Sequence, residues 1–322
     1  MSKAKKPVAS LSLDLDNEWC FMQTAGDAGW TDYPTYLPEI VPRILEFFAK
    51  HDIAITFFIV GRDAELDKNH AALRSIAESG HEIGNHSFGH QPWLQEYSAE
   101  ELDEELATAE IAIRGATGIT PRMFRGPGYS YTQEVLEALK RRGYDFDCSS
   151  FPNATAALGR LYLFRQKALK SGDQKQRSQL FGRNSEVFRP LKPYEWNLPG
   201  GRLLEIPVTT LPFLRVPIHF SYVLYLASFS ESIGMAYFRF AMFVCAAVGV
   251  EPSMLFHPLD FMGSDDKRPS VQFFPGMKKT SKEKIRILDK CISVIKRRFE
   301  ILPMGEHAAR IRKREQISVL DF

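Results

Sequence analysis

The stretch Ile53–Val60, IAITFFIV, decides the fold class of this 322-residue chain. Its β-branched and aromatic residues run without a break, which is typical of a strand buried on both faces, as in a parallel sheet. The preceding segment Tyr36–Lys50 has apolar residues at helical spacing. The following segment His70–Ser79 is also predicted to be helical and to end at Gly80. A buried strand between two such helices indicates an α/β protein built from βαβ units.

The same alternation continues along the chain and is interrupted twice. Further strands are predicted at Pro7–Asp16, His81–Asn85, Arg122–Arg125, Tyr144–Cys148, Leu203–Val208 and Ser253–Phe256, and further helices at Ala99–Gly115, Thr132–Arg142 and Ser281–Phe299. Arg189–Gly201 is rich in Pro and Gly and is predicted to be a loop. We interpret the basic segment Gly159–Asn184 and the apolar, aromatic-rich helical segment Pro212–Val250 as insertions after the fifth and sixth strands. The whole chain, 1–322, is thus predicted to be one domain that ends in a basic helical region, 278–322.

Composition narrows the class of protein. The chain is 44% hydrophobic and 25% charged with a net charge of +2, which is typical of a globular protein and argues against general nucleic-acid binding. Its four cysteines lack CxxC spacing, which favours a reducing compartment. Asp14 and Asp16 interrupt the first apolar run, so we expect no signal peptide and a cytoplasmic location. Charged residues divide Pro212–Val250 into runs shorter than the roughly 18 residues of a membrane span.

Polar residues follow several of the predicted strands. Asp14 and Asp16 end the first strand, the pair His86 and His90 follows the third, and His257 follows the last. The sequence Arg-Gly-Pro-Gly at 125–128 follows the fourth. The carboxyl ends of parallel strands share one face, where barrel-type active sites are built, so we expect these residues to converge.

The chemistry of these residues points to a metal ion. Two histidines at i and i+4 can bind one ion if the segment winds helically, and a catalytic zinc usually takes three protein ligands. Asp14 and Asp16 are predicted to lie on the same side of a strand, where two carboxylates repel each other unless a cation or a proton separates them. One of them would complete the ligand set of His86 and His90, and the other would accept a proton from the attacking water. Zinc suits these donors, as do cobalt and other first-row divalent metals.

The motifs resemble those of a known family. They are LSLDLDNEW at 11–19, HEIGNHSFGH at 81–90, RGPGYS at 125–130, LLEIPVT at 203–209 and LFHPLDF at 255–261. In this order and spacing they resemble the polysaccharide deacetylases with a NodB homology domain, carbohydrate esterase family 4, in particular the subgroup with a D-x-D first motif. The resemblance implies a distorted (β/α) barrel of the NodB deacetylase type and metal-dependent removal of an N-acyl group from an amino sugar.

The resemblance also implies roles for individual residues. The implied metal ligands are Asp16, His86 and His90, and the implied catalytic residues are Asp14 as general base, Arg125 as the residue that holds the base, Gly128 as an oxyanion-binding backbone N–H and His257 as general acid. An exchange of roles between Asp14 and Asp16 stays open. The fourth motif has Glu205-Ile206-Pro207 where the family usually has an aspartate and a tryptophan. Either Asp260 or Glu205 is therefore a candidate to orient His257.

The predicted function is that of a metal-dependent deacetylase that acts on an N-acylated amino sugar in cell-envelope glycan assembly. The aromatic residues of Pro212–Val250 and the basic tracts favour a lipid-linked substrate and contact with an anionic membrane surface, which would place the protein at the inner membrane face. Two alternatives stay open. One is a deformylase or another amidase acting on a non-sugar or cyclic amide, and the other is a membrane-surface binding protein with a vestigial site.

Overall fold

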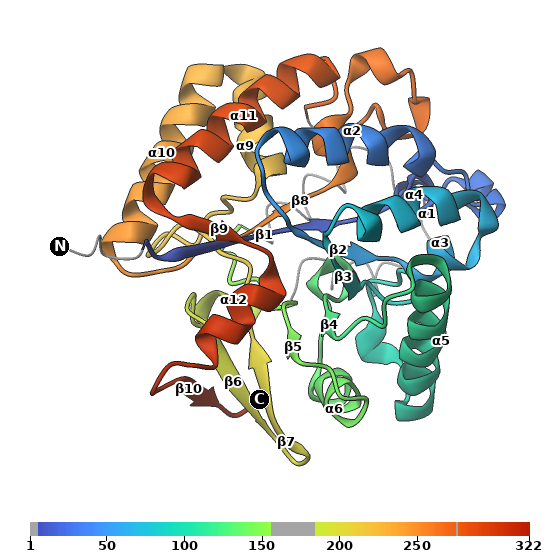
Figure 1. The fold of residues 1–322 in the computed structure, drawn as a ribbon, viewed down its shortest axis with the longest axis vertical. Coiled ribbons are helices and arrows are strands. Elements are labelled where there is room, and N and C mark those ends of the chain that lie inside the picture. Colours follow the sequence, from blue (N-terminus) through green and yellow to red (C-terminus); the bar gives the residue numbers. More distant parts are fainter. Residues whose placement is uncertain (1–5, 156–183, 275) are drawn as a thin grey trace.

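The computed structural model in Figure 1 describes residues 6–155, 184–274 and 276–322. Within these residues ten strands form one sheet, in the order β10-β6-β7-β5-β4-β3-β2-β1-β8, with β9 paired to β1. The strands are β1 (Val8–Asp14), β2 (Thr56–Ile59), β3 (Glu82–Asn85), β4 (Met123–Phe124), β5 (Phe146–Asp147), β6 (Tyr194–Leu198), β7 (Gly201–Glu205), β8 (Ser253–Phe256), β9 (Glu300–Leu302) and β10 (Ser318–Leu320). All neighbouring pairs are parallel except β6 and β7. The predicted α/β fold is confirmed.

Helices cover the sheet. They are α1 (Glu18–Ala25), α2 (Leu37–Lys50), α3 (Gly61–Glu65), α4 (Asp67–Glu78), α5 (Ala99–Thr117), α6 (Gln133–Arg141), α9 (Phe220–Phe229), α10 (Glu231–Ala247), α11 (Ser281–Arg298) and α12 (Met304–Ile311). In Figure 1, α2, α10 and α11 lie on one side of β1, and α12 and the β6–β7 hairpin lie on the other. The largest apolar core packs between the first group of helices and the sheet.

The alternation along β1 separates an apolar layer from a polar interior. Successive side chains of a strand point to opposite faces. Leu11 and Leu13 join the apolar core under the helices. The alternate residues Ser10, Ser12 and Asp14 are also buried, and they contact polar side chains instead. The inner side of the sheet is therefore a polar, solvent-excluded environment that leads to the carboxyl end of β1.

The two ends of the curved sheet approach each other beyond β7. After β7 the chain continues beside β5, where the Val208 N–H donates to the Ser150 carbonyl at 2.9 Å. The next N–H, of Thr209, donates to the carbonyl of Ser253 in β8 at 3.0 Å. A backbone hydrogen bond thus links the chain after β7 to β8, while the sheet itself stays open. This is the arrangement of a distorted barrel.

The structure corrects two secondary-structure predictions. Arg189–Gly201 is not a loop, because it contains β6, which pairs with β7 in an antiparallel hairpin. Tyr194 and Trp196 are buried on one face of β6. The Pro and Gly residues on both sides of this short alternation made the segment resemble a loop in the sequence. The region 278–322 is not only helical, because β9 and β10 accompany α11 and α12. The predicted basic insertion 159–184 lies outside the described residues except for Asn184.

The apolar insertion is helical, as predicted. Pro212–Val250 contains α9 and α10, and α10 also packs against α11. In the described part of the chain, no helix has both the length and the apolar character that crossing a membrane requires.

Candidate active site

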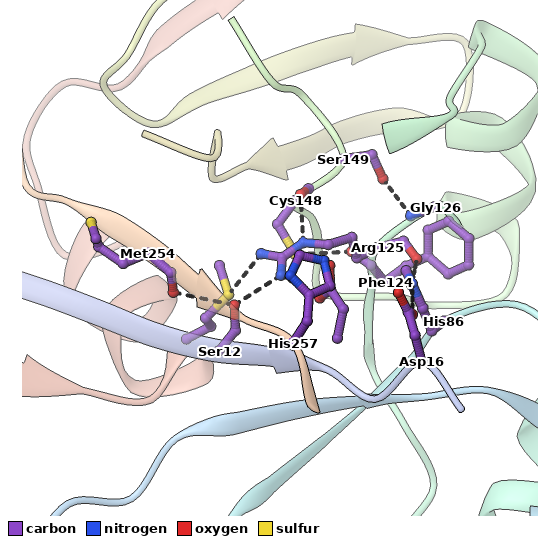
Figure 2. Close-up of polar contacts among 12 residues, drawn as sticks. Ser12, Asp16, His86, Phe124, Arg125, Gly126, Cys148, Ser149, Met254 and His257 are labelled. Atoms are coloured by element: carbon purple, nitrogen blue, oxygen red, sulfur yellow. Dashed lines mark hydrogen bonds and ion pairs between the residues drawn. The ribbon is translucent and has the colours of Figure 1, made fainter. Parts of the chain in front are cut away.

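The polar residues that follow β1, β3, β4 and β8 converge as predicted. Asp16 lies two residues beyond β1, His86 directly follows β3, and Arg125 directly follows β4. His257 directly follows β8. Figure 2 shows these four side chains gathered at the carboxyl ends of their strands. Parallel pairing of β8, β1, β2, β3 and β4 brings these ends to one edge of the sheet.

Asp16, His86 and His90 form a cluster with the donor set of a metal site. One ligand atom from each lies within 4.8 Å of the others. Asp16 Oδ1 is 3.3 Å from His86 Nε2 and 3.1 Å from His90 Nε2. A carboxylate oxygen and two imidazole nitrogens that face one point fit a divalent first-row metal and leave room for a further ligand.

The members of this cluster shift one another's pKa values. Burial by itself would raise the pKa of Asp16, but the charge of His90 and hydrogen bonds from both histidines outweigh burial and hold that pKa below its usual range. Burial would lower the pKa of His86, but the hydrogen bond to Asp16 and the charge of Asp14 raise it. His86 Nδ1–H donates to the carbonyl of Arg125 at 2.6 Å, which leaves Nε2 free to face the cluster. The tautomer is assigned from this contact.

A tight turn carries His90 back toward His86. Ser87 and His90 both have positive φ, 61° and 52°, which costs free energy for residues other than glycine. Two sets of contacts stabilise the turn. The N–H groups of Phe88 and Gly89 both donate to Glu105 Oε1, at 2.9 and 2.7 Å, and the N–H of His90 donates to Ser87 Oγ at 3.0 Å. Glu105, on α5, therefore holds the loop that presents His90.

Asp14 lies in a different environment from Asp16. Arg125 Nη1 is 2.6 Å from Asp14 Oδ1, and both side chains are buried. The same guanidinium donates to Ser12 Oγ at 2.8 Å and to the Cys148 carbonyl at 3.1 Å, and it lies over the ring of Phe58. The contacts of Arg125 with Ser12 and Cys148 are visible in Figure 2. The geometry thus places Asp16 with the histidines and Asp14 with the arginine, although the roles stay predictions.

The turn after β4 requires glycine at its first position. A Cβ on Gly126 would lie 2.0 Å from the carbonyl oxygen of Ser130. Gly126 N–H donates to Ser149 Oγ at 2.8 Å, and Ser149 Oγ donates in turn to Asp147. Gly128 has φ +61°, in the left-handed region. Buried hydrogen bonds therefore fix the start of the turn that carries Gly128, whose N–H is predicted to bind the oxyanion.

His257 is oriented by groups on two elements. Its Nδ1 lies 3.0 Å from Ser221 Oγ, and that hydroxyl lies 3.1 Å from Asp260 Oδ2. The backbone N–H of His257 donates to the same carboxylate oxygen at 2.9 Å. Glu205, the other candidate, instead accepts from Trp196 Nε1 and from the Ser150 N–H, both at 3.0 Å. Of the two candidates, Asp260 is therefore the carboxylate that contacts His257, and Ser221 mediates its contact with the ring.

Two features of the site were not predicted from the sequence. Ser221 is one serine among the apolar residues of Pro212–Val250, and only the packing of α9 brings it to His257. Asp63 is a buried carboxylate that accepts from Asn17 Nδ2 at 2.6 Å and from Trp19 Nε1 at 2.9 Å, and thereby holds the chain after Asp16. Burial raises the pKa of Asp63 to about 7. No local sequence pattern marks either residue.

Comparison with known proteins supports the family. Residues 26–146 match the family model described as polysaccharide deacetylase. A peptidoglycan-N-acetylglucosamine deacetylase of Bacillus cereus is 33% identical over 89 residues, which cover 28% of this chain and 31% of that protein. A chitooligosaccharide deacetylase of Azorhizobium caulinodans is 31% identical over 108 residues, which cover 33% of this chain and 50% of that protein. The matches thus span half or less of either relative's length.

A solved structure resembles the whole chain. The crystal structure of a Mycobacterium smegmatis protein assigned as a polysaccharide deacetylase superposes with a TM-score of 0.64 and covers 99% of this chain and 95% of that one. Its sequence identity is 15%, so the likeness concerns the fold. Fold and site together define an α/β protein with a candidate metal-hydrolase centre. The segment 26–146, less than half of the chain, resembles the polysaccharide deacetylase family.

Proposed function

We propose that this protein is a metal-dependent hydrolase that removes an N-acetyl or similar N-acyl group from an amino sugar. The proposal depends on two groups of side chains that lie at the same edge of the sheet, a candidate metal site and a buried ion pair. The first is the cluster of Asp16, His86 and His90. The second is the buried ion pair of Asp14 and Arg125. The peptidoglycan and chitooligosaccharide deacetylases that match part of the chain support an N-acetylated sugar polymer as the substrate class.

Amide hydrolysis needs an activated water, stabilisation of the developing oxyanion and a proton for the leaving amine. Asp14, held by Arg125, would accept the proton of the attacking water. The N–H of Gly128 would donate to the oxyanion, and His257 would protonate the leaving nitrogen. A divalent metal held by Asp16, His86 and His90, with zinc favoured over cobalt, would supply Lewis-acid polarisation of the acyl group.

Acetate release from N-acetylglucosamine oligomers tests this function. The purified protein, supplemented with Zn²⁺ or Co²⁺, is expected to release acetate. The variants Asp14→Asn, His86→Ala and His257→Ala are expected to lose about 100-fold or more in rate, because each removes a group that acts on the reacting atoms. His70→Asn is the matched control, since His70 lies outside the site and contacts the Ala64 carbonyl. Wild-type rates in all three site variants would contradict the assignment.

We further propose a lipid-linked substrate of cell-envelope assembly and contact with an anionic membrane surface. The support is an exposed apolar stripe on α10, formed by Ile233, Ala236, Phe240, Phe243 and Ala247. Phe229, at the end of α9, and Phe213 are 74% and 82% exposed. Exposed aromatic residues beside basic ones suit a membrane interface, and here Arg239 interrupts the stripe while Arg286 and Lys290 pair with Glu231 beside it. The cytoplasmic location, at the inner membrane face, stays a prediction.

A further inference from the structure

The environment of His257 contains a chain of hydrogen bonds that the family resemblance did not suggest. Asp260 is 3% exposed and lies in the short 3-10 helix Pro258–Phe261. Ser221 lies in the first turn of α9 and reaches both Asp260 Oδ2 and His257 Nδ1. The His257 N–H donates to the same carboxylate oxygen. The imidazole and the carboxylate are thus connected through one hydroxyl group.

The hydrogens of this chain can be assigned from the chemistry of the three groups. An ionised carboxylate only accepts hydrogen bonds, and a serine hydroxyl has one hydrogen to donate. Because Asp260 Oδ2 must receive that hydrogen, Ser221 Oγ is left as an acceptor toward His257. The imidazole nitrogen Nδ1 therefore carries a hydrogen, and Nε2 is the nitrogen that can take up a proton and release it.

The charged and titratable neighbours His219 and Lys284 do not compete with the hydrogen bonds among His257, Ser221 and Asp260. His219 lies beside His257, with ring centroids 6.3 Å apart. Burial lowers the pKa of His219 to about 3, so this ring stays neutral near pH 7 and does not compete for the proton. On the side of Asp260, the carbonyl of Leu259 accepts from Lys284 Nζ at 2.8 Å, which fixes the short turn to α11.

We propose that Ser221 is a positioning residue that links the imidazole of His257 to Asp260 and holds His257 in the Nδ1–H tautomer, with Nε2 toward the leaving amine. This inference rests on the proposed function. It gives the apolar segment Pro212–Val250 a second role, because that segment also supplies a residue that orients the general acid. In serine hydrolases a carboxylate orients the active histidine directly, whereas here a hydroxyl group stands between them.

Substitution of Ser221 tests the proposal through two substrates. An amide needs a proton on its leaving nitrogen, whereas a 4-nitrophenyl ester has a leaving group that departs without one. Ser221→Ala is expected to lower kcat for an N-acetylglucosamine oligomer by about 10- to 100-fold and to leave cleavage of 4-nitrophenyl acetate within about 3-fold of wild type. Ser221→Thr keeps the hydroxyl and is expected to restore most of the amide activity. Ser228→Ala is the matched control, since Ser228 lies on the same helix and its hydroxyl donates to the Tyr225 carbonyl.

Nitrogen NMR of the imidazole gives a second readout that needs no substrate. ¹⁵N chemical shifts of His257 are expected to report the Nδ1–H tautomer in the wild-type protein and a mixture in Ser221→Ala. Equal loss of amide and ester cleavage, or an unchanged tautomer in Ser221→Ala, would overturn the positioning role. Failure of the wild-type protein to cleave any amide while its tautomer responds to Ser221→Ala would instead overturn the proposed function and leave the hydrogen-bond chain established.

Discussion

Arg125 shows how a single residue determines the character of the site. Its guanidinium is fully buried, a position that is costly for a charge unless it is paired and hydrogen-bonded. Asp14 supplies the counter-charge, and Ser12 and the Cys148 carbonyl accept two further hydrogen bonds. Each partner comes from β1 or from the chain after β5, so the arginine also ties these elements together. The base and the polar interior are therefore one structural unit.

The buried His81 makes stability depend on pH. It accepts a hydrogen bond from the Ile55 N–H at Nδ1, at 3.1 Å, and packs against Phe57. Burial lowers the pKa of His81 from 6.5 to about 4, so the folded state favours the neutral ring. Its contribution is fully present above pH 6.5 and is lost as the pH falls toward 4, because the unfolded state then binds the proton more tightly. We expect the loss to be about 2–3 kcal/mol in urea unfolding.

The variant His81→Asn isolates this contribution, because asparagine offers a neutral acceptor that does not titrate. Its unfolding free energy is expected to fall less steeply between pH 6.5 and 4 than that of the wild-type protein. His70→Asn, on the half-exposed His70, should leave the wild-type slope unchanged. Identical slopes for wild type and His81→Asn would show that His81 is not the group responsible.

Site residues were predictable from the sequence only where they lie close together along the chain. His86 and His90 are four residues apart, and Asp14 and Asp16 two apart, so local geometry was enough to suggest each pair. Trp19 and Ser221 take their places through contacts with residues distant in sequence. Trp19 bonds to Asp63, 44 residues away, and Ser221 bonds to His257, 36 residues away. Such contacts follow from packing, which no local pattern encodes.

At the scale of elements, α5 supports the candidate metal site without providing a ligand. Glu105 on this helix accepts two N–H groups of the turn that carries His90. We predict that Glu105→Ala lowers the affinity for Co²⁺ by about 10- to 100-fold, because loss of an outer-sphere partner loosens the ligand it holds. Titration with Co²⁺, followed by its visible absorption, measures this change in the absence of substrate.

The neighbouring Glu104→Ala is the matched control, since Glu104 is exposed on the same helix. Thermal unfolding without metal should show both variants folded. If Glu105→Ala bound Co²⁺ as tightly as Glu104→Ala does, the turn would be held by its own Ser87 contact and not by α5.

Elements were predictable where one pattern dominated the local sequence. Continuous apolar runs predicted β2 and β8, and helical spacing predicted α2 and α11, because burial alone determines these patterns. Strand β6, the first arm of the hairpin, was missed because its alternation spans only five residues between prolines and glycines. The edge strand β10 is three residues long and owes its conformation to pairing with β6. The strand β10 therefore forms only when β6 is already in place.

At the scale of the molecule, the order of strands and helices was enough to predict the fold class. Parallel βαβ units place every strand end on one edge, and this rule brought together residues from four strands. The antiparallel hairpin and the contact between Thr209 and Ser253 were not predictable, since they depend on how the curved sheet meets its own far end. The position of the site was thus more predictable than the way in which the barrel is completed.

The exposed face of α10 leads to a prediction about the whole molecule. Phe240 and Phe243 are 54% and 56% exposed, although each would gain about 1.5–3 kcal/mol if it were fully buried. We expect the protein to sediment with vesicles that contain phosphatidylglycerol at low salt and less so with neutral vesicles, because Arg239 is exposed on α10 and Arg286 and Lys290 of α11 share the single carboxylate of Glu231 beside it. The double variant Phe240→Ser/Phe243→Ser is expected to bind the anionic vesicles at least about 10-fold more weakly.

The control for this experiment is an apolar residue of similar exposure elsewhere on the surface. Ile111 is 64% exposed on α5, which lies far from α10 in Figure 1. Ile111→Ser should therefore bind vesicles as the wild-type protein does, whereas a general effect of surface hydrophobicity would weaken both variants. Equal recovery of the wild-type protein in the supernatant with and without anionic vesicles at low salt would exclude the membrane contact. The lipid-linked substrate would then lose its main structural support.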